Sequence, residues 1–158
     1  MKLKKILGVS VMKKLSALIC GALLTTSAIS FAAVSPDKII LGNITPGMTE
    51  SEVLSICGEP QYKHKDKWTY NNFTVEFDKK ILGDVVEEIE TKSSGVTTYG
   101  GVAVGQSAEI LNSTFGSADK VEVEHNRTKY KYRSTDGSKS IEFKVVDGVI
   151  RKISCELD

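Results

Sequence analysis

The chain has 158 residues and a formal net charge of +1, with 26% charged and 41% hydrophobic residues. This length and composition indicate one globular domain, or two very small domains that share a core. Removal of residues 1–32 as a signal peptide would take away five lysines and no acidic residue, which lowers the net charge to −4. A general nucleic-acid-binding protein needs a basic surface, so nucleic acid is excluded as a predicted partner.

Residues 1–32 have the pattern of a secretory signal peptide. Lysines precede an uncharged, mostly apolar run from Leu15 to Ile29, and small residues occupy both ends of Ser30-Phe31-Ala32. A basic n-region, a short apolar h-region and a small-x-small site form this signal, and the run is too short for a stable membrane span. We predict a secreted or cell-envelope bacterial protein that is cleaved after Ala32, with translation starting at Met1 or Met12.

Two alternatives to cleavage stay open. Cys20 could carry a lipid anchor, although Ile19 stands where a lipoprotein signal has a small residue and the apolar run continues beyond the cysteine. The segment could also stay uncleaved, and the protein would then contact the membrane only through it.

Two segments of the remaining chain resemble each other. Residues 41–49 align with residues 99–107 at an offset of 58, and no gap is needed across 17 positions. The alignment pairs glycine with glycine at three places, namely Gly42 with Gly100, Gly47 with Gly105 and Gly58 with Gly116. Self-similarity of this kind predicts an internal duplication, with a first repeat at residues 33–94 and a second at residues 95–158.

Each repeat is predicted to open with a helix. Thr49 can cap the first helix, Glu52 follows three residues later and completes a capping box, and Gly58 supplies a left-handed stop. The cap and the stop recur 58 residues later, but Ile110 replaces the acidic residue of the capping box. The second helix is therefore expected without the reciprocal cap of the first.

After each helix apolar and polar residues alternate, which predicts strands. Two-residue turns are expected at Asn71-Asn72 in the first repeat and at Asp136-Gly137 in the second. The side chains expected to lie opposite each other across these turns are Trp68 with Val75, Tyr132 with Ile141, and Tyr130 with Phe143.

The last hairpin can be built in two registers. A two-residue loop at Asp147-Gly148 would set Lys152 against Phe143 on the core face. A three-residue loop with Gly148 left-handed would instead bury a better set, Val149, Ile153 and Cys155. We therefore predict the three-residue loop.

These elements predict an α+β fold. It consists of two tandem units, each a helix or helix pair followed by three to four antiparallel strands. The two units share one sheet, and the helices cover its apolar face. The opposite sheet face is expected to be solvated and to carry mixed charge.

The first predicted helix and its flanks resemble a known superfamily. The residues that carry the resemblance are Ile44-Thr45-Pro46-Gly47-Met48-Thr49, Glu52-Val53 and Gly58-Glu59-Pro60. They are similar to the helical signature of the β-lactamase inhibitory protein superfamily, which the outer-membrane assembly lipoproteins of the SmpA/OmlA type share. The duplication over residues 39–157 is more like the inhibitor, which also has two units.

The resemblance implies tandem helix-loop-helix units that present a concave sheet to a protein partner. The inhibitor uses an acidic hairpin loop of its first unit, and the matching turn here, Asn71-Asn72, contains no acidic residue. The inhibitor also carries a disulfide within each unit, whereas this chain has one cysteine per unit after cleavage.

Cys57 and Cys155 are those two cysteines. In an oxidising compartment they could form one disulfide. The alternative is that both are small buried apolar residues. The distance between them decides, and the sequence does not supply it.

No residue is predicted to be catalytic, and no metal or cofactor is expected. His64 and His125 are the only histidines, and each stands in a polar stretch, where a single histidine is usually solvated. Gly100-Gly101 has the composition of a phosphate-binding loop, but its alignment with Gly42 favours a turn.

A basic stripe is the best candidate for binding. Side chains two residues apart on a strand share one face, so four basic residues of one strand should join Lys144 of the next. Such a patch could attract an acidic protein surface, an anionic lipid or a wall polymer, although an ordinary solubilising face has the same composition. The candidate binding residues are Arg127, Lys129, Lys131, Arg133 and Lys144, with Asn71 and Asn72 of the first hairpin loop.

The sequence thus predicts an exported, non-enzymatic protein-binding module. Its partner would be another protein, and an acidic surface is one kind that the basic stripe could attract. The resemblance implies inhibitor-like binding through the open sheet face or the hairpin loops. The alternative is a structural envelope-maintenance or outer-surface assembly protein of the SmpA/OmlA type.

Overall fold

The computed structural model describes residues 33–78 and 84–158 of the chain. The predicted signal peptide lies outside these residues, as do both candidate start sites and Cys20. Among the residues described, no helix is both long and apolar enough to cross a membrane.

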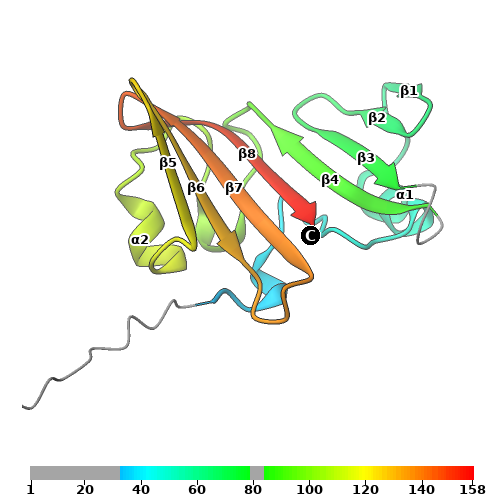
Figure 1. Cartoon of the computed structure of the whole chain (residues 1–158). Helices are drawn as coiled ribbons and strands as arrows, with labels where there is room; N and C mark the ends of the chain where they lie inside the picture. Colours follow the sequence, from blue (N-terminus) through cyan, green and yellow to red (C-terminus); the bar gives the residue numbers. More distant parts are fainter. Residues whose placement is uncertain (1–32, 79–83) are drawn as a thin grey trace, which may run out of the picture.

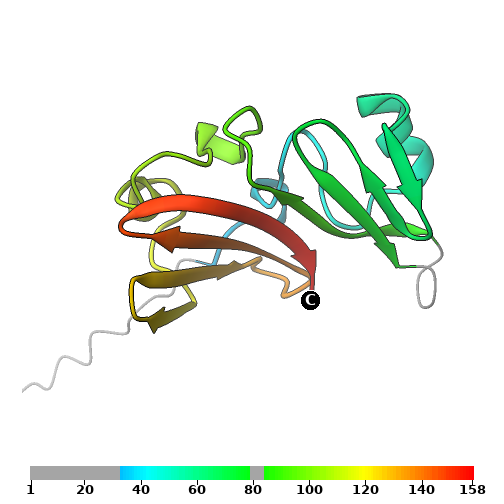
Figure 2. The same ribbon diagram turned by 90° about the horizontal axis from the view of Figure 1, so that it is seen from above.

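A single antiparallel sheet of eight strands dominates the molecule (Figures 1 and 2). The strand order is β1-β2-β3-β4-β8-β7-β6-β5, so the first four strands form one half and the last four the other. The halves join in the middle, where Ile89 of β4 lies opposite Cys155 of β8. The strands are β1 (Tyr62–His64), β2 (Lys67–Thr69), β3 (Thr74–Asp78), β4 (Val85–Thr91), β5 (Lys120–Glu124), β6 (Arg127–Arg133), β7 (Lys139–Val146) and β8 (Val149–Leu157).

The helices are short. They are α1 (Glu50–Cys57), α2 (Ile110–Phe115) and the 3-10 turns η1 (Pro36–Lys38) and η2 (Tyr99–Gly101). The predicted capping box on α1 is confirmed, since the Thr49 hydroxyl accepts from the Glu52 amide and the Glu52 carboxylate accepts from the Thr49 amide. At the start of α2 the residue before Ile110 is already helical and makes no side-chain cap, in keeping with the missing acid.

The predicted fold class is wrong. We expected two α+β units with helices over one face of their shared sheet, and the structure is instead mostly one eight-stranded sheet. The helices span only eight and six residues and bury three side chains between them, Val53, Leu111 and Phe115. Elements this small cannot cover the apolar side of so wide a sheet, and other parts of the chain do so.

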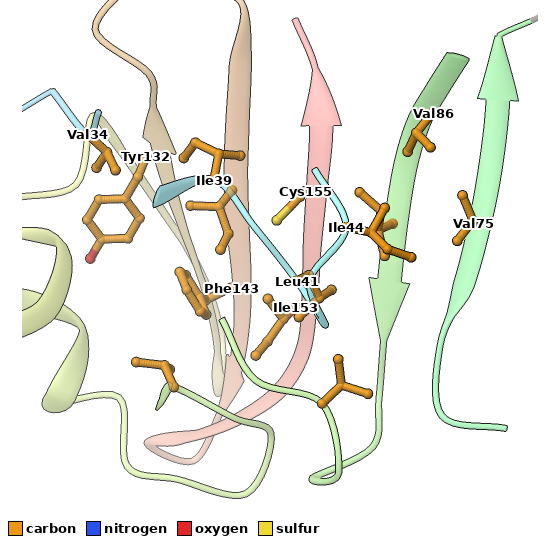
Figure 3. Packing of buried hydrophobic residues seen from close by; sticks show 14 of the residues in the cluster. Val34, Ile39, Leu41, Ile44, Val75, Val86, Tyr132, Phe143, Ile153 and Cys155 are labelled. Carbon is orange, nitrogen blue, oxygen red and sulfur yellow. The ribbon is translucent and has the colours of Figure 1, made fainter. Parts of the chain in front are cut away.

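Two largely irregular segments, residues 34–48 and 95–106, contribute the apolar cover of the middle of the sheet. Figure 3 shows Ile39, Leu41 and Ile44 of the first segment beside Cys155 and Ile153 of β8. All five side chains are fully buried. A backbone hydrogen bond from the Gly42 amide to the Thr97 carbonyl, 3.0 Å long, ties the two covering segments together.

The first two predicted hairpin registers are confirmed. Trp68 lies opposite Val75, Tyr132 opposite Ile141, and Tyr130 opposite Phe143. Trp68 and Tyr132 are buried on the core side, while Tyr130 is half-buried against the core. The alternating pattern therefore identified the face of these strands that packs inward.

The predicted three-residue loop of the last hairpin is wrong, but the predicted core face of β8 is confirmed for Ile153 and Cys155, which are both fully buried. The loop has two residues, Asp147 and Gly148, both with positive φ (51° and 76°), which is the geometry of a type I′ turn. A β-bulge farther along shifts the register, so Phe143 meets Ile153 and not Lys152. The two-residue loop is compatible with the pairing of Phe143 and Ile153 because the bulge takes up one extra residue of β8.

Positions 58 residues apart have closely similar backbone geometry. Gly47 and Gly105 have φ values of 93° and 95°, and Gly58 and Gly116 have values of 71° and 80°. The Gly47 amide donates to a carbonyl of β4 and the Gly105 amide to a carbonyl of β8, each at 2.8 Å. These glycines have the same local role in the two halves, and a duplication of the chain stays a prediction.

Asp136 holds the turn between β6 and β7, and we expect it to make this turn sensitive to acid. Its Oδ1 accepts from the Ser134 hydroxyl at 2.6 Å and from the Ser138 amide and hydroxyl at 3.0 and 2.8 Å. These bonds, led by that of Ser134, lower the pKa of Asp136 to about 2. A lowered carboxyl pKa contributes stability that is present above the unfolded value and is lost as pH falls through the folded value.

The expected result is a smaller loss of stability between pH 4 and pH 2 for Asp136→Asn than for the parent protein. Asparagine keeps an acceptor oxygen in the turn but does not titrate. Urea midpoints at the two pH values measure the difference. Glu109→Gln is the control, because that exposed carboxylate makes no hydrogen bond or ion pair within the described residues. Equal acid sensitivity of Asp136→Asn and the parent would contradict the assignment.

Candidate binding face

The face of the sheet opposite the core is hollowed over β5 to β8. The hollow has a volume of about 590 Å³. Lys129 and Lys144 lie opposite each other there, and along the strands they alternate with the buried or half-buried Tyr130 and Phe143. We call this site the cationic hollow, because its lining contains six basic residues, Lys92, Arg127, Lys129, Lys144, Arg151 and Lys152, against two acidic ones, Glu122 and Glu124.

The bulge in β8 supplies two of the six cations. Lys144 pairs with Lys152 and Val145 pairs with Ile150, which leaves Arg151 without an opposite residue. Arg151 and Lys152 both line the hollow as a result. In a regular strand neighbouring side chains point to opposite faces, so the bulge is the reason that both can face it.

Three of the cations make no ion pair within the described residues. They are Arg127, Lys144 and Arg151. Lys129 is 3.7 Å from one carboxylate oxygen of Glu122, and Lys120 is 2.6 Å from the other. The unpaired positive charge of the hollow is therefore concentrated where β6, β7 and β8 meet.

Lys152 differs from these three because acidic residues of β4 hold it. Its ammonium group forms an ion pair with Glu90 and lies 4.0 Å from Glu88, while Lys92 is 3.2 Å from Glu90. Burial raises the pKa of Glu88, and Lys152 only partly offsets this. Burial also acts on Glu90, but hydrogen bonds and charge interactions with Lys152 and then Lys92 together outweigh it and lower the pKa of that carboxyl. Lys152 thus mainly neutralises the acidic residues of β4.

The residues of the predicted basic stripe fall into two groups, one that lines the hollow and one that is paired with an acidic residue outside it. Arg127, Lys129 and Lys144 line the hollow, as predicted for one shared face, but Lys131 and Arg133 do not. Lys131 is 3.0 Å from Asp158 and Arg133 is 3.3 Å from the same carboxylate. The C-terminal residue therefore neutralises the far end of the stripe.

Asn71 and Asn72 lie at a different place from the cationic hollow. They line a separate depression with residues such as Tyr70 and Phe73, and this depression shares no residue with the hollow. Asn71 accepts a hydrogen bond from the Gln61 side chain, and the Asn72 carbonyl accepts one of 2.6 Å from the Thr91 hydroxyl. These contacts give the two asparagines a role in holding the β2–β3 turn.

Cys57 and Cys155 are both free thiols. Cys155 is fully buried in the centre of the sheet between Ile89 and Ile141, and Cys57 is half-buried at the end of α1. Burial raises the pKa of both thiols. Of the two alternatives considered for this pair, Cys155 fits the buried apolar residue.

Neither histidine lines the hollow. His64 is exposed on β1, with its ring stacked 6.3 Å from that of Tyr62, and His125 is exposed in the β5–β6 turn. Gly100 and Gly101 both have positive φ within the η2 turn. Within residues 33–78 and 84–158, no group of three or more histidine, cysteine or acidic side chains is placed to hold a metal ion.

Sequence reasoning missed Lys92, Arg151 and Lys152 as members of the site. The segment containing Arg151 and Lys152 was predicted as a strand, but strict alternation puts only one of the two on the polar face. The observed geometry depends on where β8 bulges against β7, for which the sequence offers no local signal. Lys92 joins the site because β4 lies beside β8, which is a long-range feature of the topology.

Comparison with known proteins finds two bacterial proteins of low sequence identity among the solved structures. No protein-family model matches the chain, and no curated protein matches it. The crystal structure of a DUF4309 family protein, YjgB, from Bacillus subtilis subsp. subtilis str. 168 is 18% identical, with a TM-score of 0.48 over 70% of this chain and 78% of that one. An extracellular protein containing an SCP domain from Bacillus anthracis str. Ames is 10% identical, with a TM-score of 0.50 over 71% of this chain.

The second of these proteins is extracellular, and this chain spans 44% of its length. At 10% identity the likeness shows the fold alone. Neither structure is described as a β-lactamase inhibitory protein or an SmpA/OmlA-type lipoprotein, so that resemblance stays a prediction.

Proposed function

We propose that this chain is an exported, non-enzymatic module that binds an acidic protein surface through the cationic hollow. The observation that carries the proposal is the group of three unpaired cations, Arg127, Lys144 and Arg151, in one concave site. Burying an unpaired cation in an interface is favourable only if the partner supplies negative charge. The chemistry of this site therefore calls for an anionic partner.

Two further observations support this proposal. The net charge after removal of residues 1–32 would be −4, so the hollow is a local positive site on an acidic protein, which favours selective over general attraction of anions. The Glu122 carboxylate in the lining of the hollow is held by Lys120 and Lys129, which favours a role in charge balance over acid–base chemistry. Export rests on the signal-peptide pattern, and the extracellular location of the Bacillus anthracis protein agrees with it.

A peptide titration tests this function. A fluorescein-labelled oligoglutamate peptide serves as the acidic surface, and anisotropy at low ionic strength reports its binding. We expect the triple variant Arg127→Ser/Lys144→Ser/Arg151→Ser to weaken binding by at least about tenfold, because it removes all three unpaired charges. Salt should weaken binding to the parent protein more than binding to this variant.

Arg133→Ser is the matched control. Arg133 is on the same strand and face as Arg127, but it is paired with Asp158 outside the hollow. It should change the dissociation constant by less than about twofold. Equal losses for the control and the triple variant would show that only general charge matters and would overturn the assignment. Binding of inorganic polyphosphate without any binding of the peptide would also overturn it, in favour of a phosphate-bearing polymer.

A further inference from the structure

Strand β5 is an edge of the sheet with apolar side chains exposed to solvent. Val121 is 51% exposed and Val123 is 70% exposed. β6 lies on one side of β5, and no strand among the described residues lies on the other. An edge strand presents unpaired backbone amides and carbonyls, which makes it a template for another strand.

Charged side chains are one protection of such an edge, and β5 has three, Lys120, Glu122 and Glu124, but it has no kink and no cover strand among the described residues. Its five residues pair with β6 in one uninterrupted register, with no bulge and no proline. The opposite edge strand, β1, has only three residues. Natural proteins usually shorten, kink or cover an exposed edge, and β5 is the longer of the two edges here.

We propose that β5 pairs antiparallel with β5 of a second copy of this chain. The register that aligns all five residues places Glu122 on the two-fold axis. Lys120 then lies opposite Glu124 of the second copy, and Val121 lies opposite Val123 of the second copy. Symmetry repeats both pairs, so the strand is complementary to itself in charge and in hydrophobicity.

The two Glu122 side chains meet at the axis of this dimer, and like charges opposite each other are unfavourable. Each Glu122 already has Lys120 at 2.6 Å and Lys129 at 3.7 Å from its carboxylate oxygens. Four lysines therefore surround two glutamates at the axis. The repulsion between the two Glu122 carboxylates is offset by the lysines that each copy already holds beside its own Glu122.

The dimer joins two eight-stranded sheets into one continuous sheet. A two-fold axis perpendicular to the sheet keeps both polar faces on the same side, so the two cationic hollows would face the same direction. Glu122 and Glu124 line the hollow, which places each hollow beside the joining edge. Bivalent binding through both hollows rests on the proposed function, whereas pairing of the strands does not.

Charge reversal at the strand ends tests the pairing in the purified protein without any ligand. Sedimentation velocity over a range of protein concentrations should reveal a monomer–dimer equilibrium for the parent, and a weak one because the interface is small. Lys120→Glu and Glu124→Lys should each raise the dimer dissociation constant by at least about tenfold, since symmetry makes each substitution act twice. The double variant Lys120→Glu/Glu124→Lys should restore dimers, and the two single variants mixed together should form heterodimers.

Tyr62→Lys on the β1 edge is the control and should leave the dimer unchanged. Circular dichroism confirms that every variant is folded. A parent protein that stays monomeric up to its solubility limit would overturn the inference. So would a double variant as monomeric as the singles, or loss of the dimer on Tyr62→Lys. Each outcome is read without the acidic peptide, so failure of the dimer and failure of the proposed function are distinguishable.

Discussion

Phe143→Ala is expected to destabilise the protein by about 3–5 kcal/mol, the largest effect of any single substitution proposed for this chain. Phe143 is fully buried on β7. Its ring lies 5.2 Å from that of Phe115 and 6.0 Å, edge-on, from that of Tyr132. Truncation removes these contacts and leaves a cavity that the flanking strands can close only in part, because they are held by their own pairing.

A loss of this size approaches the whole stability of many small domains, which is about 5–15 kcal/mol. Urea unfolding followed by tryptophan fluorescence measures it, since Trp68 is the one tryptophan and is buried in the other half of the sheet. Phe73→Ala is the matched control. Phe73 is half-buried and stacks on Tyr70 at 4.7 Å, so its truncation should cost about 1–2 kcal/mol.

The same experiment tests whether the two halves unfold together. Trp68 is on β2 and Phe143 is on β7, but both belong to one continuous core. A lower midpoint for Trp68 fluorescence in Phe143→Ala is expected, because β4 and β8 pair in the middle and the covering segments are bonded to each other. An unchanged Trp68 transition, with loss of structure only in the second half, would contradict a single cooperative unit.

Sequence signals that span only a few residues correctly predicted the helix cap and the strand register described above. The Thr49–Glu52 capping box depends on residues three positions apart, and the Asp136-Gly137 turn sets the register of the strands beside it. Such features are decided within a few residues, so a sequence contains all the information they need.

The fold class could not be predicted in the same way. Residues 34–48 and 95–106 lack a helical or strand period, yet Ile39, Leu41 and Ile44 within the first segment are fully buried. Irregular segments that cover a sheet are held by long-range contacts, such as the bond from Val34 to Arg133. We assigned the cover to helices because helices have a recognisable pattern, and irregular cover has none.

The candidate site was half predicted for a related reason. A period of two placed Arg127, Lys129 and Lys144 on one face, as the structure has them. The same period also placed Arg133 on this face. The structure instead pairs Arg133 with Asp158, and this pairing depends on the tertiary structure, so the sequence of the strand does not reveal it. The face of a strand can be read from its sequence, whereas the partners of its charges come from neighbouring strands.

Lys152→Met is expected to cost about 1–2 kcal/mol at pH 7. The Lys152 side chain is 19% exposed and pairs with Glu90, which is 21% exposed. Loss of one partner costs about 3–5 kcal/mol in a fully buried pair and about 0–1 kcal/mol at the surface, and this pair lies between these cases. Methionine keeps much of the length of the lysine stem, so the change reports mainly the charge.

Lys92→Met is the matched control, because Lys92 also binds Glu90 but is 72% exposed. It should cost about 0.5 kcal/mol or less, since solvent screens its charge. Equal costs for the two lysines would contradict the view that burial makes Lys152 the important partner. Urea midpoints at pH 7 separate the two predictions.

The dependence of the Lys152→Met deficit on pH follows from the acids that the lysine faces. Burial already raises the pKa of Glu88 above its usual value, and removal of Lys152 takes away the charge that partly offsets this. A carboxyl with a raised pKa loses stability as pH rises through that value, so the deficit relative to the parent should grow from pH 4 to pH 7. A deficit independent of pH would mean that lost packing, and not lost charge, explains the cost. Because Lys152 is already neutralised by β4, unlike Arg127, Lys144 and Arg151, its main contribution should appear in stability rather than in binding of the acidic peptide.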